Sequence, residues 1–227
     1  MLSILWIRKV GCAILLLTFV VFAPYTLWAQ GTITSVDKTI TRLAVIPFQA
    51  VVPEDGSSTV QCPICGSVNS SGSIVKGAEK IVEEIFTDKL RDLKNTEIIP
   101  LERSAGLYQL ISTDSLKQAL SQIIQKTGKE LHADVLAVGY VYRYRERVGY
   151  DYSAERPASV AFEIHLISVK DGSTLWRGIF DKTQKSLMED VFQVASFFKG
   201  GAKWLTAREL TKLGVDEVFS TFSGFEP

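Results

Sequence analysis

Two cysteines separated by two residues, Cys62 and Cys65, form the one chemically loaded motif of this 227-residue chain. Two thiolates at this spacing can bind one edge of a tetrahedral zinc site, or they can close a small, reducible disulfide ring. A structural zinc site usually has four protein ligands. The pair therefore predicts half of a metal site at most.

The segment reads Cys62-Pro-Ile-Cys65-Gly66 and resembles one knuckle of the zinc ribbons and rubredoxins, which use two knuckles. The only histidines, His132 and His165, lie in or beside predicted apolar strands, and neither has ligand spacing to the cysteines. We therefore expect no zinc site within one chain. A zinc ion shared between two subunits is the metal-binding alternative.

Thioredoxin-type redox chemistry is the second thiol hypothesis. It requires the first cysteine at a helix N-terminus, where the helix dipole lowers the thiol pKa. Here residues 67–71 separate the pair from the next predicted helix, and Gly66 stands where c-type haem attachment needs a histidine. A structural disulfide in the loop is the expected state of the two cysteines.

A second cluster combines aromatic and cationic side chains, which are enriched where proteins dock onto one another. The alternative is an edge hairpin whose tyrosines cover the core and whose arginines are solvated. Both interpretations remain open from the residues alone. The contact surface would consist of Tyr140, Tyr142, Arg143, Tyr144 and Arg145, with Tyr150 and Tyr152 close by in the sequence.

Catalytic signatures are absent from the sequence. It has no glycine-rich phosphate-binding loop, no nucleophile elbow and no pair of histidines with a carboxylate. Glu163 and His165 are interpreted as an ion pair or as surface positions rather than as active-site groups. We therefore expect a protein without enzymatic activity. The 25 basic and 25 acidic side chains balance, so the charge gives no reason to expect a nucleic-acid partner.

The N-terminus has the order of a secretory signal. Arg8 and Lys9 precede the apolar run Val10–Ala23, and Ala29 offers a small residue at the cleavage point. The alternative is an uncleaved anchor, because about 20 mostly apolar residues can span a membrane. Cys12 lies at the start of this apolar run, close to Arg8 and Lys9, rather than after it, and is therefore not expected to be a lipidation site. We expect residues 1–29 to export the chain to the periplasm, with membrane contact only through an uncleaved leader.

The elements that must position these side chains follow from hydrophobic periodicity. Residues 30–41 are a flexible lead-in, and the loop 50–73 is rich in Gly, Pro and Ser. Asp171-Gly172 predicts a hairpin turn that pairs Ile164 with Ile179. The strands are expected at 42–48, 97–100, 134–147, 159–169 and 174–181, and the helices at 73–95, 115–127, 187–198 and 202–220.

This order predicts one α/β (α+β) domain over residues 42–227, with a mixed sheet of about five strands flanked by helices. The first half of the strand 134–147 is expected to be buried on both sides, and its second half, with the tyrosines, is expected to emerge at the surface.

Three segments resemble a group of envelope proteins: the relatives of the curli secretion lipoprotein, the lipoprotein activators of penicillin-binding proteins and the N-terminal domain of the Tol-system propeller protein. The resemblance spans residues 42–180. It rests on Arg42-Leu-Ala-Val-Ile-Pro-Phe48, Glu97-Ile-Ile-Pro-Leu-Glu-Arg103 and Gly128–Gly139, within which His132-Ala-Asp134 leads into the strand.

The resemblance implies a mixed sheet flanked by helices, no catalysis, and a role in binding partners or building assemblies in the periplasm. The chain departs from the group because it lacks the lipidated cysteine and the membrane hairpins of the curli channel, and because it carries the Cys62 loop. We therefore expect a non-catalytic periplasmic accessory protein whose partner is an envelope protein or another copy of the chain. The competing hypothesis is a thiol-redox or zinc-handling protein centred on Cys62 and Cys65.

Overall fold

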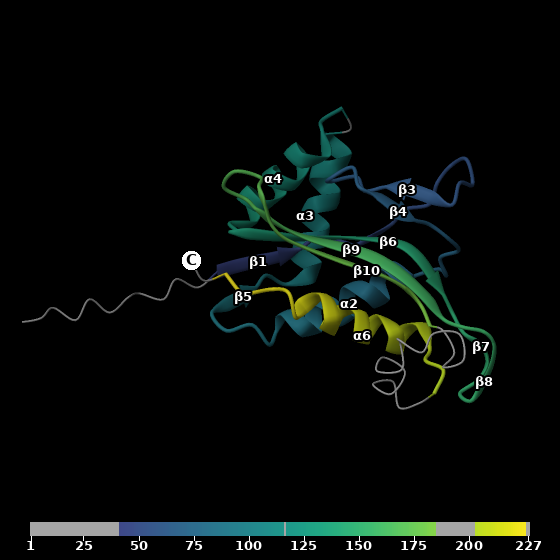
Figure 1. Cartoon of the computed structure of the whole chain (residues 1–227). Coiled ribbons are helices and arrows are strands. Elements are labelled where there is room, and N and C mark those ends of the chain that lie inside the picture. The colour runs from purple at the N-terminus through teal and green to yellow at the C-terminus, as the bar shows by residue number, and fades with distance from the viewer. Residues whose placement is uncertain (1–40, 116, 185–202, 226–227) are drawn as a thin grey trace, which may run out of the picture. The chain divides into compact units, whose positions relative to one another are not determined.

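A mixed six-stranded sheet forms the centre of the computed structural model, which describes residues 41–115, 117–184 and 203–225 (Figure 1). The strands follow the order β10-β9-β6-β1-β5, and β2 pairs with β6 outside this path. The central β1 is parallel to β5 and β6, whereas β9 is antiparallel to β6 and β10. The strands are β1 (Thr41–Val45), β2 (Gln49–Ala50), β5 (Thr96–Ile98), β6 (Val135–Arg145), β9 (Ser159–Ser168) and β10 (Thr174–Thr183).

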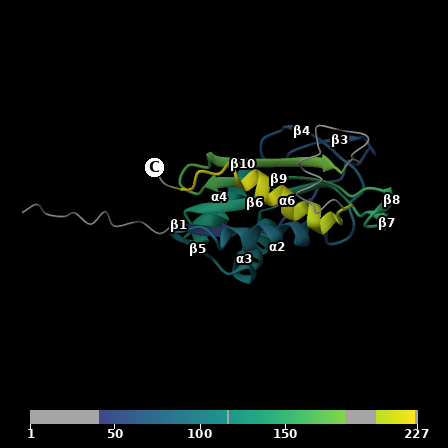
Figure 2. The ribbon, with the colours of Figure 1, turned by 60° about the horizontal axis from the view of Figure 1, so that its bottom comes forward.

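Helices cover both faces of this sheet, so the predicted fold class is confirmed. Helices α2 (Ala78–Leu90) and α6 (Ala207–Phe219) pack on one face, and α3 (Leu101–Asp114) and α4 (Leu120–Leu131) pack on the other (Figures 1 and 2). The long strands β6 and β9 are buried on both sides, which explains their nearly continuous apolar sequence.

Two small hairpins complete the fold. The first joins β3 (Thr59–Gln61) to β4 (Val68–Ser70) and lies on the face that α3 and α4 cover (Figure 1). It occupies the segment expected to be a long loop, so that prediction was wrong in detail. The second joins β7 (Val148–Tyr150) to β8 (Ser153–Arg156), between the strands expected at 134–147 and 159–169.

One glycine of β6 makes room for the Phe48 ring, which lies between β1 and β2. A Cβ atom on Gly139 would lie 2.3 Å from the Phe48 ring, so only glycine fits opposite this ring. The backbone N–H of Phe48 donates to the Glu83 carboxylate at 2.7 Å, which ties the chain to α2. Phe48 therefore sits buried against Phe86, with ring centroids 5.7 Å apart.

Helix boundaries differ from the expectations where caps and neighbours decide them. Helix α4 starts five residues later than expected and continues past Gly128, because the left-handed cap is His132 rather than the glycine. Helix α6 begins at a capping box formed by Thr206 and Glu209. Helix α3 was missed entirely.

The register of the β9–β10 hairpin is shifted by one residue from the prediction. Ile179 lies opposite Glu163 rather than Ile164, because the pairing is irregular between Thr174 and Trp176. This shift decides which side chains of the two strands share a face.

Several predictions fall outside the described residues. These are the signal at 1–29, the lead-in through residue 40 and the helix at 187–198. Among the residues that are described, none of the helices combines the length and apolar character needed to cross a membrane.

Candidate metal centre

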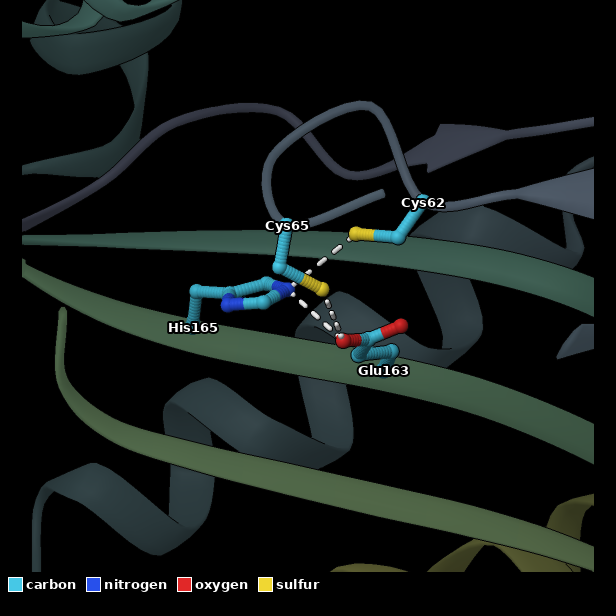
Figure 3. Close-up of side chains that lie close together, drawn as sticks. All are labelled: Cys62, Cys65, Glu163 and His165. Carbon is cyan, nitrogen blue, oxygen red and sulfur yellow. Dashed lines mark hydrogen bonds and ion pairs between the residues drawn. The ribbon is translucent and has the colours of Figure 1, made fainter. Parts of the chain in front are cut away.

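Four side chains with metal-binding atoms converge between the β3–β4 hairpin and the sheet. These are Cys62, Cys65, Glu163 and His165, called the tetrad below. One ligand atom from each lies within 4.8 Å of all the others. Figure 3 shows the two sulfur atoms approaching from the hairpin and the carboxylate and imidazole rising from β9.

Strand geometry places the two sheet residues of the tetrad. Glu163 and His165 are two positions apart in β9, and alternate residues of a strand point to the same face. Both are fully buried. His165 Nε2 lies 3.0 Å from Glu163 Oε1, so the two heads are adjacent above the strand.

A tight turn places the two cysteines. The backbone N–H of Cys62 donates to Ser67 O at 2.8 Å, and the N–H of Gly66 donates back to Cys62 O at 2.9 Å. Gly66 has a φ of 72°, the left-handed conformation that favours glycine. This turn directs both sulfurs at β9: Cys62 Sγ lies 3.3 Å from His165 Nε2, and Cys65 Sγ lies 3.3 Å from Glu163 Oε1.

Polar neighbours hold the Glu163 carboxylate in one orientation. Oε1 faces the tetrad and also accepts from Arg177 Nε, while Oε2 accepts from Tyr142 OH at 2.9 Å and from Asn69 Nδ2 at 3.1 Å. Arg177 additionally donates to Ser67 Oγ in the hairpin. The carboxylate is thus positioned by β6, by β10 and by β4 at once.

Burial and hydrogen bonding act in opposite directions on the acidic groups. Burial opposes the ionisation of Glu163, but the hydrogen bonds from His165, Arg177 and Tyr142 outweigh it and hold the pKa of this carboxyl well below its usual range. Burial raises the pKa of the Cys62 thiol. The centre therefore holds an ionised carboxylate beside a buried thiol, whose loss of a proton to solvent needs a nearby cation to stabilise the thiolate.

The spacing of the tetrad is close to that of a tetrahedral zinc site. Zinc bonds to sulfur, nitrogen and oxygen of ordinary length imply ligand–ligand distances of roughly 3.4 to 3.8 Å. Three contacts measure 3.0 to 3.3 Å and have to lengthen by a few tenths of an ångström, and since the four atoms span up to 4.8 Å, a pair at that limit has to close by about 1 Å. Two thiolates, one carboxylate, Zn²⁺ and the Arg177 guanidinium together sum to zero charge.

One feature of the centre departs from well-built zinc sites. His165 Nδ1 is buried, and within the described chain it has no hydrogen-bond partner. Metal-binding histidines almost always donate from their second nitrogen, and losing that partner typically costs 10- to 100-fold in affinity. The centre is therefore expected to bind zinc more weakly than a fully supported site of the same ligands.

The arrangement overturns two arguments drawn from the sequence. The missing ligands were sought in a second subunit because neither histidine has ligand spacing to the cysteines, yet His165 and Glu163 of the same chain lie beside them. The structure has both cysteines as free thiols rather than as the expected disulfide. The remaining histidine, His132, caps α4 and does not join the tetrad.

The partner-binding surface expected on β6 is wrong for its tyrosines. Tyr140, Tyr142 and Tyr144 are each 1% exposed, because layers on both faces of the sheet cover β6. Arg143 and Arg145 are half-buried, and Arg143 pairs with Asp181. The exposed aromatic residues are instead Tyr150 and Tyr152, at 82% and 83%.

The sequence did contain a signal for the two residues that were missed. Glu163 and His165 interrupt an apolar strand at alternate positions, so both had to enter the same side of a buried sheet. Buried polar side chains require partners, and these two point to a polar centre. The spacing along the chain did not show that Cys62 and Cys65 would lie beside Glu163 and His165.

Comparisons with known proteins give a likeness of fold. No family model matches the chain, and no curated protein matches its sequence significantly. Among solved structures, the PelC dodecamer from Paraburkholderia phytofirmans matches with a TM-score of 0.46 at 12% identity, covering 83% of this chain and 91% of that one. Lipoprotein GNA1162 from Neisseria meningitidis matches with a TM-score of 0.40 at 12% identity, covering 71% and 98%.

The C-terminal domain of LpoB from Salmonella enterica matches with a TM-score of 0.33 at 14% identity, covering 64% of this chain and 84% of that one. LpoB is a lipoprotein activator of penicillin-binding proteins, one of the groups that the sequence resembles.

Proposed function

We propose that this protein is a non-catalytic accessory protein of the cell envelope that binds one zinc ion per chain at the tetrad. The zinc ion fixes the β3–β4 hairpin on the sheet and keeps it rigid for a partner in the envelope. The observation that carries the proposal is the approach of four ligand atoms to within 4.8 Å of one another.

The ligand set favours zinc over harder cations. Thiolate sulfur and imidazole nitrogen suit zinc, whereas magnesium and calcium prefer oxygen ligands. Two sulfurs, one nitrogen and one oxygen complete a tetrahedral shell without a solvent position, which is typical of structural sites. A structural role also fits the position of the centre, where a small hairpin meets a long buried strand.

Metal analysis of the purified protein tests the proposal. We expect one zinc per chain after reconstitution, and cobalt substitution should give the absorption of a tetrahedral thiolate site. His165→Gln should lose the metal, while His132→Asn is the matched control because Asn also tolerates the left-handed φ of 53° at that position.

Three results separate the alternatives. Half a zinc per chain, in a dimer, would favour the intermolecular site that the cysteine pair alone suggests. Equal zinc binding by the two histidine variants would contradict the tetrad. If the natural chain and His132→Asn both bind no zinc, the four side chains form only a hydrogen-bonded polar cluster.

A thiol-redox function is the second candidate, and the exposure of Cys65 beside the buried Cys62 favours it. An exposed thiol next to a second thiol can exchange with an outside disulfide. The raised pKa of Cys62 weighs against this function, because the thiolate is the reactive form. A Cys65→Ser variant with normal zinc-free folding and unchanged cellular phenotype would exclude it.

The partner can be sought from the hairpin itself. Val68 on β4 is 66% exposed, and a photo-crosslinking residue placed there samples the surface that the zinc would hold. We expect captured envelope protein in zinc-replete cells and reduced capture in the His165→Gln background. The same residue at Tyr152, on the other hairpin, is the matched control.

A further inference from the structure

Strand β10 has one edge without a partner in the described chain. It is ten residues long and pairs with β9 alone, and it forms the end of the strand order (Figure 2). A long edge strand exposes a row of unpaired N–H and C=O groups, which another strand can pair with. The strand contains no proline, and its one irregularity lies at its start, near Thr174.

The exposed face of β10 carries two large apolar side chains. Leu175 and Ile179 are 50% and 46% exposed on the side that carries Arg177. Single exposed apolar residues are common, but here Leu175 and Ile179 lie on the same face of one unpaired strand, on either side of Arg177. Val68 adds a third apolar side chain nearby, because its neighbours Ser67 and Ser70 contact Arg177 and Asp181 of β10.

The sequence of β10 is complementary to itself when two copies run antiparallel about Ile179. In this register Ile179 faces Ile179 of the second copy, and Arg177 faces Asp181 in both halves of the pair. Opposite charges and apolar pairs at facing positions stabilise antiparallel strands. Both charges already have partners within the chain, Arg177 with Glu163 and Asp181 with Arg143, but their side chains are 33% and 39% exposed and can also face a second copy.

We propose that two copies of this chain associate through their β10 edges about a twofold axis at Ile179. The two six-stranded sheets then join into one continuous sheet. A twofold interface of this kind uses the same surface on both subunits and closes at two copies. The two β3–β4 hairpins lie on the same face of the joined sheet.

The test combines the molecular mass in solution, measured by sedimentation, with cysteine crosslinking at chosen positions of the full chain. By sedimentation over a range of concentrations we expect a dimer for the natural chain and for Ile179→Val. Ile179→Lys places two like charges at the centre, and we expect its dimer to dissociate at concentrations at least about tenfold higher. Circular dichroism checks that this exposed substitution leaves the fold intact.

Crosslinking fixes the register. Ile179→Cys should give a reducible dimer on mild oxidation, because facing residues of an antiparallel pair are about 4.5 to 5.5 Å apart. Leu175→Cys is the matched control, since the two copies of this position lie about 27 Å apart in the same register. Both variants are compared with the natural chain, which carries Cys62 and Cys65.

A monomer at all concentrations would overturn the proposal, as would an oligomer that Ile179→Lys leaves unchanged or a crosslink equal at both positions. The result is independent of the zinc proposal, because Ile179 is not a ligand. Zinc content per chain should be the same in the natural chain and in Ile179→Lys, whatever their masses.

Discussion

The two small hairpins of this protein have similar lengths but opposite surroundings. The β3–β4 hairpin meets the sheet through a buried polar centre, with hydrogen bonds from Ser67 and Asn69 to Glu163. The β7–β8 hairpin exposes nearly all of its residues, including Tyr150 and Tyr152. The comparison suggests that buried polar groups hold the first hairpin on the sheet, whereas the second is tied at its turn, where the Trp204 backbone N–H donates to Asp151 O at 2.6 Å.

The largest expected effect comes from removing the carboxylate that anchors the first hairpin. Glu163→Ala leaves His165 and Arg177 without their shared anion, and in zinc-free protein we expect the free energy of unfolding to fall by about 3 kcal/mol. Glu155→Ala, at an exposed position of β8, is the control and should change it by less than about 0.5 kcal/mol. Urea unfolding measures both. Equal effects would mean that the two hairpins do not differ in anchoring.

Removing zinc should loosen one hairpin and not the other. At free zinc about 100 times the dissociation constant, binding adds about 2.7 kcal/mol to whatever it holds folded. Hydrogen exchange at the β3–β4 amides should therefore quicken about 100-fold on chelation, while the β7–β8 amides stay within about twofold. Uniform quickening across the chain would instead indicate global stabilisation.

A single hydroxyl gives a smaller and more specific test. Tyr142→Phe removes the bond to Glu163 Oε2, a hydrogen bond to a charged group that is worth about 1.5 kcal/mol or more. Tyr144→Phe removes a buried hydroxyl that lies near Thr211 without a well-formed hydrogen bond, so we expect a smaller loss of stability than for Tyr142→Phe. Thermal unfolding of the two variants distinguishes anchoring by Tyr142 from simple burial of a tyrosine.

The smallest effect belongs to the exposed hairpin. Tyr150→Ala and Tyr152→Ala, singly or together, should change the free energy of unfolding by less than about 0.5 kcal/mol per site, because more than four-fifths of each side chain is exposed. A loss above 1 kcal/mol would show that this hairpin packs on the rest of the chain after all.

Local signals in the sequence predicted the elements that depend on local chemistry. The β9–β10 hairpin follows from Asp171-Gly172 and two flanking apolar runs, and α2 follows from its apolar stripe. The register was wrong by one residue because an irregularity near Thr174 has no signature in the turn. Helix α3 was missed because it begins directly after Pro100 at the end of β5, where the apolar run suggested a strand ending.

The candidate centre could be predicted only in half. Cys62 and Cys65 lie in one hairpin, and their close spacing along the chain identifies them as potential metal ligands. His165 and Glu163 are about a hundred residues away and meet the loop only through the order of strands in the sheet. The choice between the two interpretations of Tyr140, Tyr142 and Tyr144 could not be made from the sequence for the same reason, since their burial depends on which layers cover β6.

The contact between Phe48 and Gly139 couples two positions that lie far apart in the sequence. Any residue larger than glycine at 139 would push the ring aside, and the ring carries with it the backbone N–H that Glu83 accepts. In related chains we therefore expect these two positions to coevolve, so that an alanine at 139 accompanies a smaller side chain at 48. Introducing Gly139→Ala alone should be harmful, and adding Phe48→Leu should restore part of what was lost.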